Sequence, residues 1–543
     1  MKKKKIIIAS ITFVVLLAVL IYFLIDNSSS DVVYSSVKDL GSEVKLDMSD
    51  ERIEWDNYTT NNIELTDSIT ITTPGVYFLT GTINDGLITV NTTGNVKLVL
   101  NNVTVTNNCG PSIYVENAET VVISTVEGTV NTFTDGEKYT SYDGIDGCIY
   151  SKDDLVLEGS GTLVVNSNYE DGIVSKDDLK INSGTYIINS KDDAIRGKDS
   201  VYIKDGTFTI NALGDGIKST NESDTLKGYV KIDNGTFSIN ANDDGIDAVT
   251  KILIEDGIFN INVSNLDEDS SAKGIKAGGN IIILDGDFTI VASDDAIHSN
   301  DFIGVENGNF SIESKDDGIH ADNTLIIDNG GINIAKSYEG LEALNIIIND
   351  GDIKIVSSDD GINVAEKTDS SGNNQKMPGM ESGNARLIIN GGNVYVNAKG
   401  DGLDANGSIY INGGYVLVDG PTSNGDGALD YDGELVITKG TLIAVGSSGM
   451  AQGISASSSQ YGVLINFSKT YSSGSVIKIL DSNDEEVMSY ETTKNFSSIV
   501  YSSEKLTKGS YKVQVNDEDY TSFEIDDISV VVGRNGFNNR PRR

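Results

Sequence analysis

Short stretches of alternating apolar and polar residues recur along most of the chain, each ending at a glycine or asparagine turn. The stretch 201–210 is typical: it reads Val-Tyr-Ile-Lys-Asp-Gly-Thr-Phe-Thr-Ile, with apolar positions two residues apart on either side of an Asp-Gly turn. A period of two residues predicts β-strands, and the repeat shows no helical periodicity. The pattern therefore predicts an all-β protein.

These strands belong to a repeat of 22 residues that ends at an acidic corner of the form Asp-Asp-Gly-Ile. The corner residues at this spacing are Ile173, Ile195 and Ile217, then Ile275, Ile297, Ile319 and Leu341, with Ile362 after 21 residues. Because one coil of two or three short strands cannot bury its apolar face alone, we expect the coils to stack in parallel. The sequence predicts a right-handed parallel β-helix.

One residue type recurs at the same position of the coil, two residues after the turn glycine. Its members are Tyr186, Phe208, Phe237, Phe259, Phe288 and Phe310. Stacked coils would place these rings about 4.8 Å apart, which is the spacing of neighbouring strands. We expect a ladder of aromatic rings in the core.

Segments outside the repeat divide the chain further. We assign 1–30 to an N-terminal transmembrane anchor or signal, 31–62 to a stalk and N-terminal cap, and 63–457 to the parallel β-helix. A small β cap at 458–527 would cover the open edge of the last coil, and 528–543 is a tail. Insertions near 221–228, 264–271 and 367–384 interrupt the period beside the acidic corners, which makes the corner edge the candidate working surface.

The N-terminus carries a membrane signal. Four lysines, Lys2 to Lys5, precede an uncharged run at 6–25 that is long enough to span a bilayer. The lysines should stay in the cytoplasm, so the rest of the chain would lie outside, anchored to the cell membrane. A cleaved signal, and thus a secreted protein, is the alternative.

The net charge of −41 narrows the choice of partners. It repels nucleic acid and attracts cations, so divalent metals are the first partners to consider, and no organic cofactor is expected. Cys109 and Cys148 are too few for a disulfide framework, although one bridge between adjacent coils remains possible.

The residue two positions before the corner residue forms an acidic column. Its members are Asp143, Asp171, Asp193, Asp215, Asp244, Lys273, Asp295, Asp317, Glu339, Asp360 and Asp401. Stacking like charges costs on the order of 3 kcal/mol per pair at an effective dielectric near 20, so something must compensate. The residue after the corner is cationic in five coils, which predicts a ladder of ion pairs; these residues are Arg196, Lys218, Lys276, His298 and His320.

Four corners carry an acid in that cationic slot, and we expect them to lack a protein cation. They pair Asp143 with Asp146, Asp243 and Asp244 with Asp247, Glu339 with Glu342, and Asp401 with Asp404. Carboxylates and turn carbonyls suit Ca²⁺, which takes six to eight oxygens at about 2.4 Å. The corner at 243–247 is the best calcium candidate because Asp215, one coil earlier, adds a carboxylate.

The repeated corner, with the strand that follows it at 252–257, resembles the clostridial-type β-helix carbohydrate-binding proteins that bind polygalacturonate and cellulose. The resemblance covers roughly 63–455 and includes the Met-Pro-Gly-Met insertion at 377–380. That family is similar to the family-nine pectate lyases, whose Asp-Asp-x-x-Asp calcium cluster matches Asp243, Asp244 and Asp247. The resemblance implies a calcium-dependent interaction with an acidic polysaccharide.

Three functions remain open at this point. The favoured one is polysaccharide binding, in which calcium bridges to the sugar carboxylates, Tyr142, Tyr169 and Tyr338 stack on sugars, and Arg196 and Lys218 are further ligand-binding residues. A polysaccharide lyase would need a base, for which Lys273 or Lys276 is the candidate. A calcium-stabilised adhesin or structural rod is the third alternative.

Overall fold

A computed structural model describes residues 36–38, 53–140, 142–263, 271–365 and 385–533. Within these ranges the chain is all-β apart from a single turn of 3-10 helix, η1 (Trp55–Asn57), and isolated helical residues near Val37. None of the described helices is long and apolar enough to cross a membrane. The predicted anchor at 6–25 lies outside the described residues.

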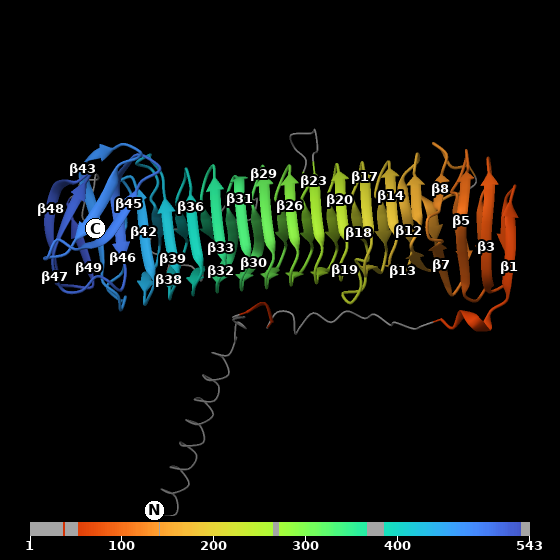
Figure 1. Ribbon diagram of the computed structural model, residues 1–543, viewed down its shortest axis with the longest axis horizontal. Coiled ribbons are helices and arrows are strands. Elements are labelled where there is room, and N and C mark those ends of the chain that lie inside the picture. The colour runs from red at the N-terminus through yellow and green to blue at the C-terminus, as the bar shows by residue number, and fades with distance from the viewer. Residues whose placement is uncertain (1–35, 39–52, 141, 264–270, 366–384, 534–543) are drawn as a thin grey trace, which may run out of the picture.

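Most strands lie in three rows that run the length of a rod, and every neighbouring pair within a row is parallel (Figure 1). The first row, the long-strand face, comprises β8 (Val130–Thr134), β11 (Thr162–Asn166), β14 (Thr185–Ser190), β17 (Thr207–Ala212), β20 (Thr236–Ala241), β23 (Ile258–Val263), β26 (Asp287–Ala292), β29 (Asn309–Ser314), β31 (Gly331–Ser337), β33 (Asp352–Ser357), β36 (Asn393–Asn397), β39 (Tyr415–Asp419) and β42 (Thr441–Gly446). Parallel stacking of successive coils is the arrangement predicted for a parallel β-helix.

The second row, the corner row, follows the acidic corners. It comprises β2 (Ile69–Ile71), β4 (Ile88–Asn91), β6 (Ile113–Asn117), β9 (Gly147–Ser151), β12 (Asp171–Ser175), β15 (Ile195–Gly197), β18 (Ile217–Ser219), β21 (Ile246–Ala248), β24 (Ile275–Ala277), β27 (Ile297–Ser299), β34 (Ile362–Val364), β37 (Leu403–Ala405) and β40 (Leu429–Tyr431). The corner therefore joins each long strand to a short strand of the same coil.

The third row completes each coil. It comprises β7 (Thr120–Thr125), β10 (Asp154–Gly159), β13 (Asp178–Ile181), β16 (Ser200–Ile203), β19 (Tyr229–Ile232), β22 (Lys251–Ile254), β25 (Ile281–Ile283), β28 (Phe302–Val305), β35 (Arg386–Ile389), β38 (Ser408–Ile411) and β41 (Leu435–Ile437). β30 (Ile319–Ile327) and β32 (Leu341–Ile348) span the second and third rows, and β1 (Thr60–Leu65), β3 (Gly75–Ile83) and β5 (Val96–Thr106) form the first coils.

The predicted aromatic ladder is confirmed. The rings from Phe208 to Phe310 stack at centroid distances of 4.7 to 4.8 Å and interplanar angles of 2 to 3°, and Tyr186 extends the stack at 5.0 Å. The turn glycine before each ring is required: a Cβ on Gly235, whose φ is 144°, would lie 2.8 Å from the ring of Phe237. The turn thus admits the ring only when glycine occupies it.

The register of one coil differs from the sequence prediction. Ile149, not Ile145, is the strand partner of Ile173, because β9 begins at Gly147. Asp143 therefore does not belong to the acidic column and is exposed in the preceding turn. The two cysteines are free: Cys109 is exposed, Cys148 is buried, and no bridge joins them.

The last coil is closed by strands that leave the parallel pattern. β46 (Phe496–Ser502) pairs antiparallel with β42 and with β43 (Gly462–Tyr471), and β49 (Ser529–Val532) lies beside β43. A separate antiparallel sheet has the order β45 (Glu486–Glu491), β44 (Val476–Leu480), β47 (Gly509–Val515) and β48 (Glu518–Ile525). Because β46 occupies the hydrogen-bonding edge of β42, the long-strand face does not end in an unpaired strand.

Candidate functional site

The acidic column has a backbone role that explains why Asp recurs there. The backbone N–H of Asp215 donates to the carboxylate of Asp193 at 3.0 Å, and the N–H of Asp244 donates to that of Asp215 at 2.6 Å. Equivalent bonds link Asp193 to Asp171, Lys273 to Asp244, Asp317 to Asp295, Glu339 to Asp317 and Asp401 to Asp360. Each carboxylate thus fixes the register of the next coil and satisfies a backbone donor there.

The second oxygen of these carboxylates faces the cationic slot, as the sequence predicts. Lys276 Nζ lies 2.7 Å from Asp244, His298 Nδ1 lies 2.8 Å from Asp295, and Lys218 pairs with Asp215. Arg196 contacts both Asp171 and Asp146. The ion-pair ladder therefore balances much of the stacked negative charge.

The expectation that four corners lack a protein cation is wrong at three of them. Lys276 reaches Asp244 and, at 3.8 Å, Asp247; Arg196 lies 2.7 Å from Asp146, and His320 lies 3.3 Å from Glu342. These cations come from other coils, and the reason is geometric. Coils are separated by about 4.8 Å, a gap that a Lys or Arg side chain can bridge.

The structure brings together part of the predicted calcium set. Carboxylate oxygens of Asp215, Asp243 and Asp244 all lie within 4.8 Å of one another. Asp247 is not a member of that group and instead faces Lys276. The assignment of calcium to this corner stays a prediction, and a metal there would compete with Lys218 and Lys276 for the same oxygens.

The corner at Asp401 and Asp404 is the one of the four at which the described residues place no cation beside the carboxylates. No Lys, Arg or His among the residues that the structure describes lies within 4.0 Å of the carboxylates of Asp360, Asp401, Asp404 or Asp430. Asp404 and Asp430 are direct strand partners on β37 and β40. Burial, together with the neighbouring carboxylates, raises the pKa of Asp360 to about 6 and those of Asp401 and Asp404 to about 7. We name these four residues the C-terminal acidic cluster.

Glu339 extends this unbalanced region by one coil. Its carboxylate accepts a hydrogen bond from Asn363 at 2.8 Å, and burial raises its pKa to about 9. Proton uptake is one way in which such groups lose their charge, and a bound divalent cation is another.

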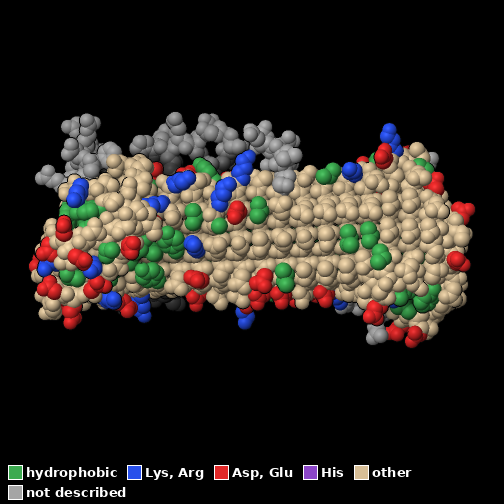
Figure 2. Space-filling view, turned by 45° about the horizontal axis from the view of Figure 1, so that its top comes forward, with side chains coloured by type: hydrophobic (Ala, Val, Ile, Leu, Met, Phe, Trp, Pro, Cys, Tyr) green, Lys and Arg blue, Asp and Glu red, His purple; other side chains and the backbone are tan. Residues whose placement is uncertain are grey.

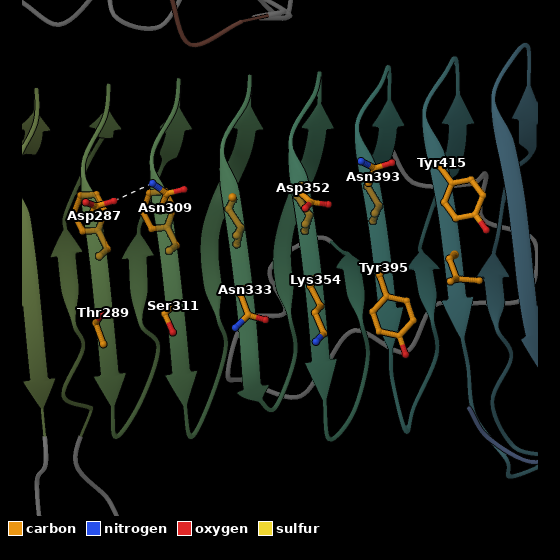
Figure 3. A pocket seen from close by; sticks show the side chains of 17 residues that line it. Asp287, Thr289, Asn309, Ser311, Asn333, Asp352, Lys354, Asn393, Tyr395 and Tyr415 are labelled. Atoms are coloured by element: carbon orange, nitrogen blue, oxygen red, sulfur yellow. Dashed lines mark hydrogen bonds between the residues drawn. The ribbon is translucent and has the colours of Figure 1, made fainter. Parts of the chain in front are cut away.

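A groove on the long-strand face was not predicted from the sequence. It has a volume of about 820 Å³ and runs across β26, β29, β31, β33, β36 and β39 (Figure 3). Its floor is formed by outward side chains of two rows: Asp287, Asn309, Asp352 and Asn393 in one, and Thr289, Ser311, Asn333 and Lys354 in the other. Tyr395, Tyr415 and Leu417 line its C-terminal end.

The aromatic end of the groove is held by the C-terminal strands. Tyr395 donates to the buried carboxylate of Asp419 at 3.1 Å, and Tyr490, from β45, donates to the same carboxylate at 2.8 Å. Tyr415 remains 40% exposed. Figure 2 shows hydrophobic side chains gathered on this side of the rod near its C-terminal end. A signal was present in the sequence: the outward position that is Thr, Ser or Asn in the coils from β17 to β31 becomes Tyr395 and Leu417.

The predicted sugar-contacting residues are differently placed. Tyr169 stacks on Tyr139 at 4.5 Å, and Tyr142 packs edge-on against Tyr139 and Tyr114. Tyr338 is 46% exposed at the corner edge. Arg196 and Lys218 are engaged in the ion pairs described above, so neither offers an unshared cation to a ligand.

The candidate lyase bases are also committed to partners. Lys273 Nζ lies 2.5 Å from Asp294, Lys276 Nζ lies 2.7 Å from Asp244, and these carboxylates raise the pKa of both lysines despite their burial. Burial lowers the pKa of a third lysine, Lys494, to about 8, but three backbone carbonyls accept its N–H groups: those of Ala398, Asp419 and Gly420. A general base needs a free lone pair near neutral pH, which none of the three supplies in this arrangement.

Part of this chain is similar in sequence to proteins that are described as carbohydrate-binding. Residues 66–318 match the model of the family described as carbohydrate-binding domain-containing protein. A carbohydrate-binding domain-containing protein of Acetivibrio thermocellus is 39% identical over 128 residues, which are 22% of this chain and 45% of that protein. The aligned region thus spans less than half the length of this relative.

A solved structure is also similar in sequence. It is the polysaccharide lyase-like protein from C. thermocellum, in a gadolinium derivative, with 30% identity over 48% of this chain and 87% of that chain. The TM-score of 0.35 is too low for the superposition to place any residue of this chain. The sequence similarities support a carbohydrate-binding family.

Proposed function

We propose, from the similarity of residues 66–318 to carbohydrate-binding domain-containing proteins, that this chain binds an acidic polysaccharide outside the cell, with calcium as a bridge. The observation that carries the proposal is the presence of two complementary features in the same coils. β36 and β39 supply Tyr395 and Tyr415 to the groove, and the corners that follow these strands lead to Asp404 on β37 and Asp430 on β40.

Each feature suits one part of a polyuronate chain. The faces of tyrosine rings stack on the apolar faces of sugars, and the Asn, Ser and Thr side chains of the groove bond hydroxyl groups. A sugar carboxylate would be repelled by a protein of net charge −41 unless a cation lay between them. Calcium held by the C-terminal acidic cluster would supply that cation, since it accepts carboxylates from both sides.

Binding is favoured over the two alternatives. Lyase activity would need a general base, and none of the three lysines described above is placed to act as one. A purely structural rod does not require aromatic side chains on the long-strand face, where the exposed apolar residues of the earlier coils are aliphatic, such as Ile187 and Ile258. We also propose that residues 6–25 anchor the protein in the cell membrane with the rod outside.

The central test is a titration of the purified protein with polygalacturonate, in calcium and again in EGTA, while the absorbance of unsaturated product is followed. We expect binding in calcium, a large loss in EGTA and no growth of absorbance. Absence of binding in both solutions would leave the structural rod, and growing absorbance would make the protein a lyase.

The calcium ligands can be tested by replacing Asp404 and Asp430 with asparagine. The double variant should bind calcium at least about 10-fold more weakly, because it loses two charged oxygens while the backbone is retained. Isothermal titration with calcium measures this change. Asp526→Asn, an exposed change of the same type, is the matched control and should leave calcium affinity unaltered.

The groove can be tested separately with Tyr415→Ala. The loss of one stacking ring, worth about 0.5–1.5 kcal/mol, should weaken polysaccharide binding about 2- to 10-fold without changing calcium affinity. Tyr338→Ala removes an equally exposed ring from the corner edge and serves as the control. If Tyr338→Ala weakens binding and Tyr415→Ala does not, the polysaccharide lies on the corner edge and not in the groove.

A further inference from the structure

The chain's only two histidines are stacked at one place in the corner row. His298 on β27 and His320 on β30 are direct strand partners, and their ring centroids are 4.8 Å apart. Both rings turn the Nδ1 atom toward the carboxylate of Asp295, at 2.8 Å for His298 and 3.9 Å for His320. Two imidazole nitrogens thus converge on one carboxylate oxygen.

Two further carboxylates complete this cluster. His320 Nδ1 lies 3.2 Å from Asp317 and 3.3 Å from Glu342. The ligand atoms form two triads that share His320, and within each triad all atoms lie within 4.8 Å of one another. We name the five residues the histidine corner: Asp295, His298, Asp317, His320 and Glu342.

The Nε2 atoms, on the outer side of both rings, also face acceptor oxygens. His298 Nε2 lies 3.0 Å from the side-chain oxygen of Asn300, and His320 Nε2 lies 3.5 Å from a carboxylate oxygen of Asp322. Nδ1 of each ring faces carboxylate oxygens, and a metal ion would take the place of the proton shared there, while the acceptor on Nε2 holds the ring in position. Metal-binding histidines are commonly held in this way by an acceptor outside the ligand set.

We propose that the histidine corner binds one divalent transition-metal ion of the zinc, cobalt or manganese type. Each triad combines imidazole and carboxylate into a mixed nitrogen and oxygen set, which suits these ions better than calcium, and the shared His320 lets one ion occupy the corner. Neighbouring ligand atoms around an ion with bonds of about 2.1 Å are roughly 3 Å apart in octahedral geometry, close to the spacings of 2.8 to 3.3 Å found here. This site is independent of the proposed calcium function.

The net negative charge of the histidine corner also favours the binding of a divalent cation. With neutral imidazoles the five residues carry three negative charges in a half-buried corner. Lys273 supplies one nearby positive charge, 3.6 Å from Asp295, but it is shared with Asp294. A divalent ion would replace the protons that otherwise hold these groups together and would tie three successive coils to one another.

The test is titration of the full-length protein with Co²⁺ and with Zn²⁺ in the presence of excess calcium. We expect one ion per chain, a visible absorption band for bound Co²⁺, and shifts of the histidine imidazole signals in NMR spectra. His320→Gln should weaken Co²⁺ binding at least 10-fold, and Cys109→Ser, which removes the exposed thiol, should leave it unchanged.

The outcomes separate this site from the calcium proposal. Asp404→Asn with Asp430→Asn should leave Co²⁺ binding intact, and His320→Gln should leave calcium-dependent polysaccharide binding intact. Circular dichroism of each variant checks that the β-helix is retained. If neither ion shifts the imidazole signals, or if His320→Gln binds Co²⁺ as tightly as the parent chain does, the two histidines are only ion-pair partners and the proposal fails.

Discussion

Replacing Phe237 with alanine should lower the free energy of unfolding by about 3–5 kcal/mol. The ring is 1% exposed and lies in the middle of the aromatic ladder, 4.8 Å from Phe208 and 4.7 Å from Phe259. Its removal would leave a cavity that the rings on either side cannot fill, because each is fixed by its own coil and by a turn glycine. Equilibrium unfolding in urea measures the loss.

The matched control lies on the same strand. Ser238 is the next residue along β20 and faces outward, so Ser238→Ala should change stability by less than about 0.5 kcal/mol. A loss below about 1 kcal/mol for Phe237→Ala would show that the stack is not a cooperative part of the core. Phe237→Leu, which retains most of the buried volume, should fall between the two.

The ladder shows why the fold could be predicted from the sequence. Its members share one position in a strict repeat, and strand spacing alone fixes the distance between them. The backbone role of the acidic column was harder to foresee, since the sequence displays only carboxylates and the costs of stacking them. The path of the turn between β17 and β18, and of the equivalent turns, decides from which backbone N–H each carboxylate accepts a hydrogen bond.

The cation that pairs with each acidic residue could not be predicted, because long Lys and Arg side chains extend from one coil to the next. The sequence places Lys276 and Arg196 in a column but does not tell which coil each will contact, and the structure directs Lys276 back to Asp244 and Arg196 to Asp146. The coil that carries β9 was also misaligned, because Asp143-Gly144-Ile145 fits the corner pattern and only strand pairing shows that Ile149 holds the corner position. The groove was missed because it is made by residues from six coils, and the change to Tyr395 and Leu417 marks only its C-terminal end.

The C-terminal acidic cluster and the ladder of ion pairs differ in how the repulsion between stacked carboxylates is relieved. Where a cation of the protein reaches the column, the stacked carboxylates are neutralised within the fold. In the coils that carry Asp401 and Asp404 the described residues supply no such cation, so these carboxylates must take up protons or bind an ion. This difference is what makes the C-terminal coils, and not the whole acidic edge, the candidate for calcium.

Replacing Arg196 with methionine tests the ion-pair ladder and should destabilise the fold by about 1–2 kcal/mol at about pH 9, with little effect near pH 6. The guanidinium contacts Asp171 and Asp146. Its removal leaves the buried carboxylate of Asp171 with no cation, whereas Asp146 keeps Lys176 at 3.5 Å. Burial raises the pKa of Asp171 to about 8 even beside Arg196, which lowers it, so loss of the arginine raises that pKa further. Methionine retains the length and the apolar packing of the side chain.

The sign of the pH dependence follows from that shift. A carboxyl whose pKa is higher in the folded state than in the unfolded state binds its proton more tightly when folded, so stability falls as the pH rises through the folded pKa. The deficit of Arg196→Met should therefore be small near pH 6 and grow as the pH passes about 8. Urea unfolding at several pH values measures it, with Lys198→Met, an exposed cation two residues away, as the control. A deficit that is the same at pH 6 and pH 9 would show that Arg196 contributes packing and not charge, and the ladder would then not be what holds the acidic column together.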